Sequence, residues 1–194
     1  MLFSPSQWQN WQNRLQQTLS TKRYQHSLAT QQAALRLAKH WGLDEEKAAL
    51  AGLVHDVARS LIPQELLARA KAAGLVIGPA EQANPKILHA PVGAIMLREE
   101  WGIADPAVLQ AVQYHTIASP AMTELDFIIY LADLLEPTRP KWAGWERLHK
   151  LAAENLIAAM VEALAYSFKY LQEDDEIIHP EAYQAYEYFQ KQLP

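Results

Sequence analysis

The sequence predicts an all-α protein built as a bundle of helices. Half of its 194 residues are hydrophobic, and among these alanine and leucine dominate over the β-branched types, which favours helices over strands. Apolar residues also recur at intervals of three and four along the chain, the spacing of a helix face turned toward a core. The length is ample for one domain with a substantial core.

Composition excludes several classes of protein. No run of 18 apolar residues occurs, so we expect no transmembrane helix, and residues 1–6 lack the charged-then-apolar pattern of a signal peptide. The absence of cysteine rules out disulfides and thiolate metal ligands. Together these features point to a cytoplasmic protein. A net charge of −5 without a basic cluster argues against a nucleic-acid groove, although a few local cations can still bind a small anion.

Start and stop signals divide the first half of the chain into helices. Ser4 is a good cap and Pro5 a good first residue, so a helix should begin there. Gly42 and Gly74 are typical residues for ending a helix. The expected helices cover 4–20, 21–41, 44–61 and 63–74, and a loop rich in glycine and proline follows over 75–84.

The second half carries similar signals. His89 lies just before Pro91, so a helix should restart or kink there. Asp105 followed by proline opens a helix that runs through His115, and Thr123 caps the next one. The remaining expected helices cover 124–136, 151–171 and 180–191, with a connector containing tryptophan and glycine over 137–150.

Six polar residues interrupt the apolar faces of these helices, and they come from five helical segments. They are His26, His55, Asp56, His89, His115 and Asp133. A helical bundle can bring such residues to one point in its core, where an unpaired carboxylate would be costly. Each one alone could be a hydrogen-bonded core histidine or a helix-terminal aspartate, but six such coincidences are less expected than one shared site. Gly93, four residues after His89, would leave room beside that histidine.

The donor types predict which metals such a site would take. Imidazoles and carboxylates without thiolates suit iron, manganese or zinc rather than calcium or magnesium. Six ligands exceed what one tetrahedral zinc ion needs, whereas two metal ions that share a carboxylate would use them all. The other histidines are expected outside the site: His40 at a helix C-terminus, His149 in a polar segment and His179 in a turn.

The order of these six residues resembles that of the HD-domain phosphohydrolases. More narrowly, Ala-Gly-Leu-Val-His-Asp-Val-Ala at 51–58 and His-Ala-Pro-Val-Gly-Ala at 89–94 resemble the YqeK family of symmetrical diadenosine tetraphosphatases, which are all-helical and di-iron. Further matching phrases lie at 23–28, 114–116 and 130–137.

The resemblance implies a single HD domain over residues 1–194. Its core would span about 18–171, with the helices at 4–20 and 180–191 packed on it. Two departures from the family pattern are Arg59, where a lysine is usual, and Ala90, where a glycine is usual. Neither removes an expected metal ligand, so substrate preference is affected more than hydrolysis.

The implied activity is hydrolysis of diadenosine tetraphosphate to two ADP by a metal-bound hydroxide. Two transition-metal ions, iron first and manganese or zinc as alternatives, would share Asp56. Arg59 would stabilise charge on the phosphates, with Arg23, Thr116 and Arg139 as further phosphate contacts.

The expected partner is therefore a small dinucleoside polyphosphate or nucleotide, not a nucleic acid or a membrane, and a homodimer is compatible with the sequence. Two alternatives stay open. One is an HD-type hydrolase of mononucleotides or guanosine alarmones, and the other is a non-catalytic nucleotide-binding module.

Overall fold

The computed structural model describes residues 2–193, and every regular element in that range is helical, which confirms the predicted all-α class. The elements are α1 (Pro5–Thr18), α2 (Thr21–Trp41), α3 (Glu45–Val54), α4 (Pro63–Ala72), α5 (Pro79–Ala83), the 3-10 helix η1 (Pro85–Leu88), α6 (His89–Glu100), α7 (Pro106–Tyr114), α8 (Glu124–Leu135), α9 (Trp145–Glu154), α10 (Leu156–Glu173) and α11 (Pro180–Gln190).

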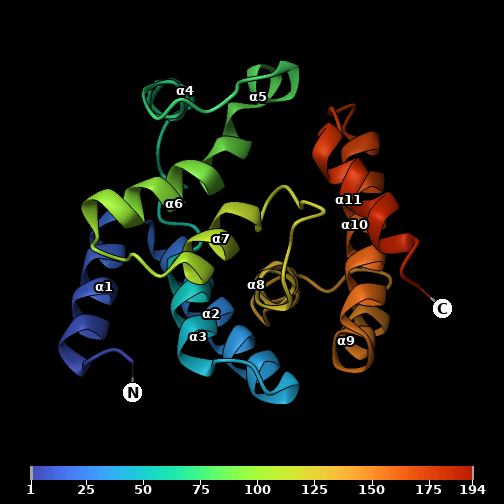
Figure 1. Cartoon of the computed structure of the whole chain (residues 1–194), viewed down its shortest axis with the longest axis horizontal. Coiled ribbons are helices and arrows are strands. Elements are labelled where there is room, and N and C mark those ends of the chain that lie inside the picture. Colours follow the sequence, from blue (N-terminus) through green and yellow to red (C-terminus); the bar gives the residue numbers. More distant parts are fainter. Residues whose placement is uncertain (1, 194) are drawn as a thin grey trace.

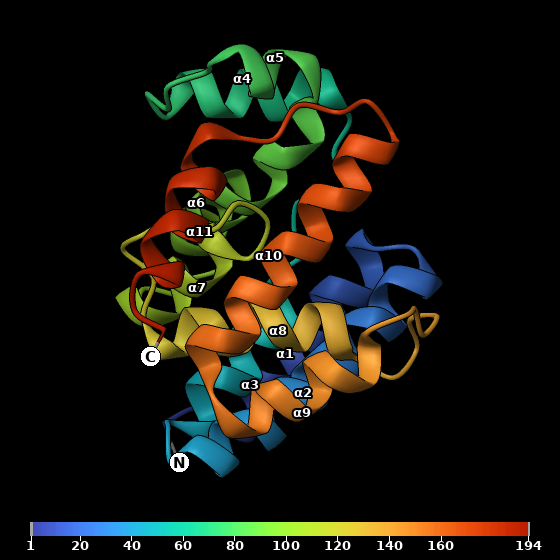
Figure 2. The same ribbon diagram turned by 90° about the vertical axis from the view of Figure 1, so that its right-hand side faces the viewer.

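Helix α8 lies at the centre of the molecule. It stands between a group formed by α2, α3 and α7 and a second group formed by α9, α10 and α11 (Figure 1). All residues from Phe127 to Ala132 are buried. In the view turned by 90°, α10 crosses in front of α8 and covers it on that side too (Figure 2). A helix that is apolar nearly all round belongs in the middle of a bundle.

The terminal helices pack on this centre. Helix α1 buries Trp11 and Leu15 and contacts α2 and α3. Helix α11 packs along α10, and the ring of Phe189 meets that of Phe127 edge-on with centroids 5.1 Å apart. None of the helices within residues 2–193 combines the length and apolar character that crossing a membrane requires.

Several helix ends follow the signals in the sequence. Ser4 caps α1 and forms a capping box with Gln7. Gly42 ends α2 in the left-handed conformation, with a φ of 67°. Asp105 accepts hydrogen bonds from two backbone N–H groups at the start of α7. The helix expected after His89 does restart there, directly after η1.

The helix predicted over 44–61 is shorter than expected. It ends at Val54, and the chain then continues through successive turns closed by bonds from the N–H of Val57, Arg59 and Leu61 to the carbonyl three residues earlier. Apolar periodicity does not separate a buried helix from a buried run of tight turns. His55 and Asp56 therefore follow the helix instead of lying within it.

Two other boundaries were wrong. The predicted loop over 75–84 contains the five-residue helix α5, because Gly78 is its cap and Pro79 its first residue. The helix predicted over 151–171 is two helices, α9 and α10, divided at Asn155. That residue is extended, with φ −159° and ψ 107°, and its side chain accepts the N–H of Ala158 to begin α10.

Candidate metal centre

The residues predicted as metal ligands meet between α2, α3, η1, α7 and α8. Two groups of three lie close enough to share an ion, with their ligand atoms within 4.8 Å of one another: His26, His55 and Asp56, and Asp56, His89 and His115. All five residues are buried. The sixth, Asp133, is half-buried and borders the first group.

Three of the four histidines stand at the end of a helical segment. His55 follows α3, His89 follows η1 and His115 follows α7. The Nδ1 of each lies 2.6–2.8 Å from the backbone carbonyl three residues earlier. Each ring donates to a carbonyl in the last turn of its segment and is fixed by it; the carbonyl of Lys86 also accepts the backbone N–H of His89. Because a carbonyl only accepts, Nδ1 carries the proton and Nε2 keeps a lone pair.

His26 reaches the same state by another route, because it lies inside α2. Its Nδ1 is 3.0 Å from Oε1 of Glu136. Glu136 is buried and also accepts the backbone N–H and the hydroxyl of Thr138, at 2.6 and 2.7 Å. A carboxylate that accepts all three bonds leaves the proton of His26 on Nδ1, so its Nε2 also faces the cluster with a lone pair.

The Nε2 atoms that keep a lone pair face one another in pairs. The Nε2 atoms of His26 and His55 are 3.2 Å apart, and those of His89 and His115 are 3.0 Å apart. Two lone pairs cannot hydrogen-bond to each other, whereas a cation that binds both satisfies both. Imidazole nitrogens beside carboxylates are ligands that transition metals accept. The cluster therefore fits a di-metal site.

Asp56 divides its two oxygens between the histidine pairs. Its Oδ1 lies 3.1 Å from Nε2 of His89 and 3.8 Å from that of His115. Its Oδ2 lies 3.8 Å from Nε2 of His55 and 3.9 Å from that of His26. A carboxylate in this position can bridge two ions, as the sequence predicts for Asp56.

Asp133 gives the two groups of ligands different numbers of donor atoms. Its Oδ1 lies 2.9 Å from Nε2 of His26 and 3.7 Å from that of His55. The side with His26 therefore offers four donors, whereas the side with His89 offers three. Catalytic metal sites keep a position open in this way.

Around His55, Asp56 and Asp133 the burial and charges favour the protonation states that metal ligands need. Burial lowers the pKa of the His55 imidazole to about 4, although nearby carboxylates oppose this, so the ring is neutral at pH 7. Burial would raise the pKa of Asp56, but the neighbouring imidazoles, His55 foremost, hold it well below its usual range. Burial of Asp133 is outweighed in the same way by Arg139, which keeps the pKa of that carboxyl low.

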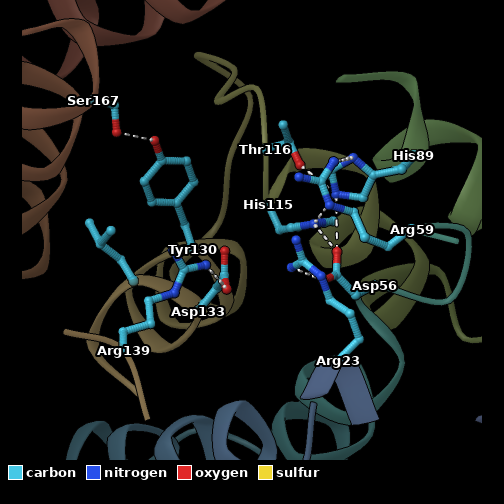
Figure 3. Close-up of a pocket in the computed structure, with 11 residues that line it drawn as sticks. Arg23, Asp56, Arg59, His89, His115, Thr116, Tyr130, Asp133, Arg139 and Ser167 are labelled. Carbon is cyan, nitrogen blue, oxygen red and sulfur yellow. Dashed lines mark hydrogen bonds and ion pairs between the residues drawn. The ribbon is translucent and has the colours of Figure 1, made fainter. Parts of the chain in front are cut away.

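Arginine side chains and a threonine hydroxyl border the cluster in one pocket (Figure 3). Arg23 Nη1 is 3.1 Å from Oδ2 of Asp56, and Arg139 Nη2 is 2.6 Å from Oδ1 of Asp133. The hydroxyl of Thr116 is 3.1 Å from Nε2 of His89.

Arg59 differs from the other two arginines, because no carboxylate within residues 2–193 forms an ion pair with it. Its Nη1 is 3.4 Å from Nδ1 of His89, but the proton of that nitrogen already points at the carbonyl of Lys86, 2.6 Å away. Burial lowers the pKa of Arg59, and nearby Arg23 adds to this, yet a guanidinium stays charged. Its donors remain available to an anion in the pocket.

The three histidines that were expected outside the site do not belong to the cluster. His40 Nε2 is 2.7 Å from the carbonyl of Ala153, and His149 is exposed beside Trp145. His179 is the cap of α11.

The prediction for Gly93 was wrong. A Cβ added there would lie 3.3 Å from Cγ1 of Val57 and 3.7 Å from Cγ1 of Val112, so this glycine permits close packing of the core and makes no room beside His89.

Sequence reasoning did not find Glu136. A glutamate between a buried helix and Pro137 is typical of an ordinary helix C-terminus. The available signal was its position: it directly follows the apolar run of α8, where burial of a charge requires a partner.

Comparisons with known proteins bear on the whole chain. Residues 23–138 match the family model described as HD domain. The chain is 32% identical to the Bacillus subtilis protein named bis(5'-nucleosyl)-tetraphosphatase, symmetrical, over 89% of this chain and 91% of that protein. It is 36% identical to the protein of the same name from Halalkalibacterium halodurans, over 87% and 89%. A crystal structure from Clostridium acetobutylicum, described as a predicted HD superfamily hydrolase involved in NAD metabolism, matches all of both chains with a TM-score of 0.92 and 32% identity.

Proposed function

The chain belongs to the HD domain family, and from that premise we propose that it is a symmetrical bis(5'-nucleosyl)-tetraphosphatase that hydrolyses diadenosine tetraphosphate to two ADP. The two relatives that carry this name align with about nine tenths of the chain. We also propose that residues 1–194 form one HD domain, because α1 and α11 pack on the same core as the helices between them.

One observation carries the chemical part of the proposal. The two oxygens of Asp56 face separate histidine pairs, which is the arrangement that two-metal phosphohydrolysis requires. His26, His55 and Asp133 would hold one ion, His89 and His115 would hold the other, and Asp56 would join them. We propose iron, with manganese and zinc as alternatives, since the donors are nitrogen and oxygen without sulfur.

When bound, the metal ions supply the Lewis acidity that polarises a phosphoryl group and makes water a nucleophile at neutral pH. The chain contributes the remaining requirements of phosphoryl transfer, which are mainly position and charge. Arg59 has donors directed into the pocket and would take a phosphate oxygen next to the attacked phosphorus. Arg23, Arg139 and Thr116 line the same pocket and would hold the flanking phosphates.

A nucleotide screen with metal-loaded protein tests the proposal. Diadenosine tetraphosphate should be the best substrate in a panel that includes mononucleotides and a guanosine alarmone. A clear preference for a mononucleotide or the alarmone would instead show an HD-type nucleotidase. Binding without turnover of any member would show a non-catalytic module.

A further inference from the structure

Two cavities adjoin the pocket that holds the cluster, and they differ in chemistry. The larger has a volume of about 630 Å³ and shares Thr116, Tyr130 and Arg139 with the cluster pocket. The smaller has a volume of about 230 Å³ and shares Arg23 and Arg59 with it. Tyr130 and Arg139 lie on one side of the cluster, and Arg59 lies on the other side with His89 and Thr116 (Figure 3). Both cavities share lining residues with the pocket of the cluster, so the cluster lies where they meet.

The larger cavity suits a nucleoside. Pockets for small organic ligands hold about 300–1,000 Å³ and are lined mainly by apolar and aromatic side chains. Trp142 and Tyr166 stack here with ring centroids 4.5 Å apart, and Tyr170 and Phe168 also line the cavity. Aromatic rings of this kind can stack on any of the bases, because every base has a flat π-face. Ser167, hydrogen-bonded to Tyr130 at 3.3 Å, offers a hydroxyl where this cavity meets the cluster pocket.

The smaller cavity has apolar lining residues, Leu61, Pro63 and Leu66, but lacks the aromatic rings of the larger one. Among the described residues, its lining includes no aromatic ring other than the imidazole of His89, which belongs to the cluster. Arg23, Arg59 and Lys86 supply three cations instead, and Lys86 is exposed. Such a surface can hold phosphate oxygens but offers no platform for a base.

We infer that the enzyme binds one nucleoside of its dinucleotide substrate specifically and contacts the other half of the substrate only through its phosphates. This inference rests on the proposed function. It assigns a further activity: a nucleoside tetraphosphate, which lacks the second nucleoside, is also a substrate. Adenosine 5'-tetraphosphate would place its adenosine against Trp142 and Tyr166 and its terminal phosphates beside Arg23, Arg59 and Lys86.

The reaction follows the same bond change as with the dinucleotide. Water forms a new P–O bond at an inner phosphorus, and the bridge between the second and third phosphates breaks. The water oxygen stays on the attacked phosphorus and the bridging oxygen leaves with the other product, so ADP and pyrophosphate are released. The two protons of water pass to the product phosphates and to solvent. No oxidant or other co-reactant is needed.

The test compares three tetraphosphates with the metal-loaded protein: diadenosine tetraphosphate, adenosine 5'-tetraphosphate and inorganic tetraphosphate. We expect kcat/KM for adenosine 5'-tetraphosphate to lie within about tenfold of that for the dinucleotide, because a group that is not recognised contributes little binding. Inorganic tetraphosphate should be slower by about a hundredfold or more, since it lacks the stacked base.

Two variants and a control test where the nucleoside and the phosphates of the substrate bind. Tyr166→Leu should lower kcat/KM for both adenosine substrates by about tenfold or more and leave inorganic tetraphosphate unchanged. Lys86→Ala should raise KM for all three. Tyr188→Leu, an exposed aromatic on α11 outside the cavity, should change none.

Equilibrium dialysis supplies a readout independent of turnover. The metal-loaded protein should bind one ADP per chain, and Tyr166→Leu should weaken that binding. Two ADP bound with equal affinity would overturn the inference, as would cleavage of the dinucleotide with none of adenosine 5'-tetraphosphate. If neither adenosine substrate is cleaved, the proposed function fails and the inference with it.

Discussion

The Nδ1 of His26 lies 3.0 Å from Oε1 of Glu136, and this contact joins the second turn of α2 to the residue that follows α8. Burial lowers the pKa of the His26 imidazole, but its contacts with Asp133 and Glu136 outweigh burial and raise that pKa above its ordinary value. Inside a helix His26 has no last-turn carbonyl to bind, unlike the three histidines at helix ends. Glu136 takes the place of that carbonyl and aims Nε2 at Asp133.

Replacement of Glu136 should therefore loosen metal binding although the residue touches no proposed ion. Glu136→Gln removes the charge that holds the imidazole, and loss of such outer partners typically costs about 10–100-fold in metal affinity. Competition with a chelator measures the change. Glu124→Gln, an exposed position in the first turn of α8, is the matched control and should bind metal as the unmodified protein does. Equal affinities for all three proteins would contradict this role of Glu136.

The purified protein should contain about two transition-metal ions per chain. His55→Ala should lose metal and activity, because a buried ligand disappears. His149→Ala should keep both, since that side chain is exposed and lies beside Trp145. Elemental analysis checks both variants. A protein that is metal-free and takes up no iron, manganese or zinc would remove the basis of the proposed site.

Arg59→Ala should lower kcat/KM by about 10²–10³-fold with bound metal unchanged, as expected for one group that stabilises transition-state charge. Arg59→Lys should recover part of the loss, because the charge remains while the planar two-donor geometry does not. Steady-state kinetics and elemental analysis on the same preparations separate the two effects. Wild-type rates for Arg59→Ala would show a residue without a role in the reaction.

Asp105 should contribute stability that depends on pH. Burial would raise the pKa of its carboxyl, but Lys47 and the N–H groups at the start of α7 lower it below the ordinary value. A carboxyl with a depressed folded pKa stabilises the fold above its unfolded pKa, near 4, and loses this contribution as the pH falls through the folded value.

We expect Asp105→Ala to lower the free energy of unfolding by about 1 kcal/mol at pH 7, a typical value for loss of an N-cap, and by less at pH 3. Urea unfolding at both values measures this. Asp105→Asn keeps the cap but not the charge, so its deficit at pH 7 should be smaller. A deficit for Asp105→Ala that grows on acidification would contradict the assignment.

The metal cluster could be predicted from the sequence because its polar residues stand within apolar stretches, where a buried polar side chain requires a partner. Val108, Ala111, Val112 and His115 form one such stripe, and a histidine at its end requires a partner. Periodicity also located most helices, since caps such as Ser4 act within one turn.

The rest depends on contacts between distant segments. The end of α3 was not predictable because the apolar residues continue past Val54 and no glycine or proline marks a stop before Pro63. The aromatic cavity forms where Trp142, in the connector before α9, meets Tyr166 of α10, and no local pattern brings those rings together. The role of Gly93 likewise depends on Val57, more than 30 residues earlier in the chain.

Hydrolysis of diadenosine tetraphosphate in ¹⁸O-water by the metal-loaded protein tests the central claim most directly. A cluster that activates water beside an inner phosphorus predicts ADP as the only nucleotide product, with the label on its terminal phosphate. AMP together with ATP would place the attack at an outer phosphorus and contradict the assignment, even if the metal site were correct.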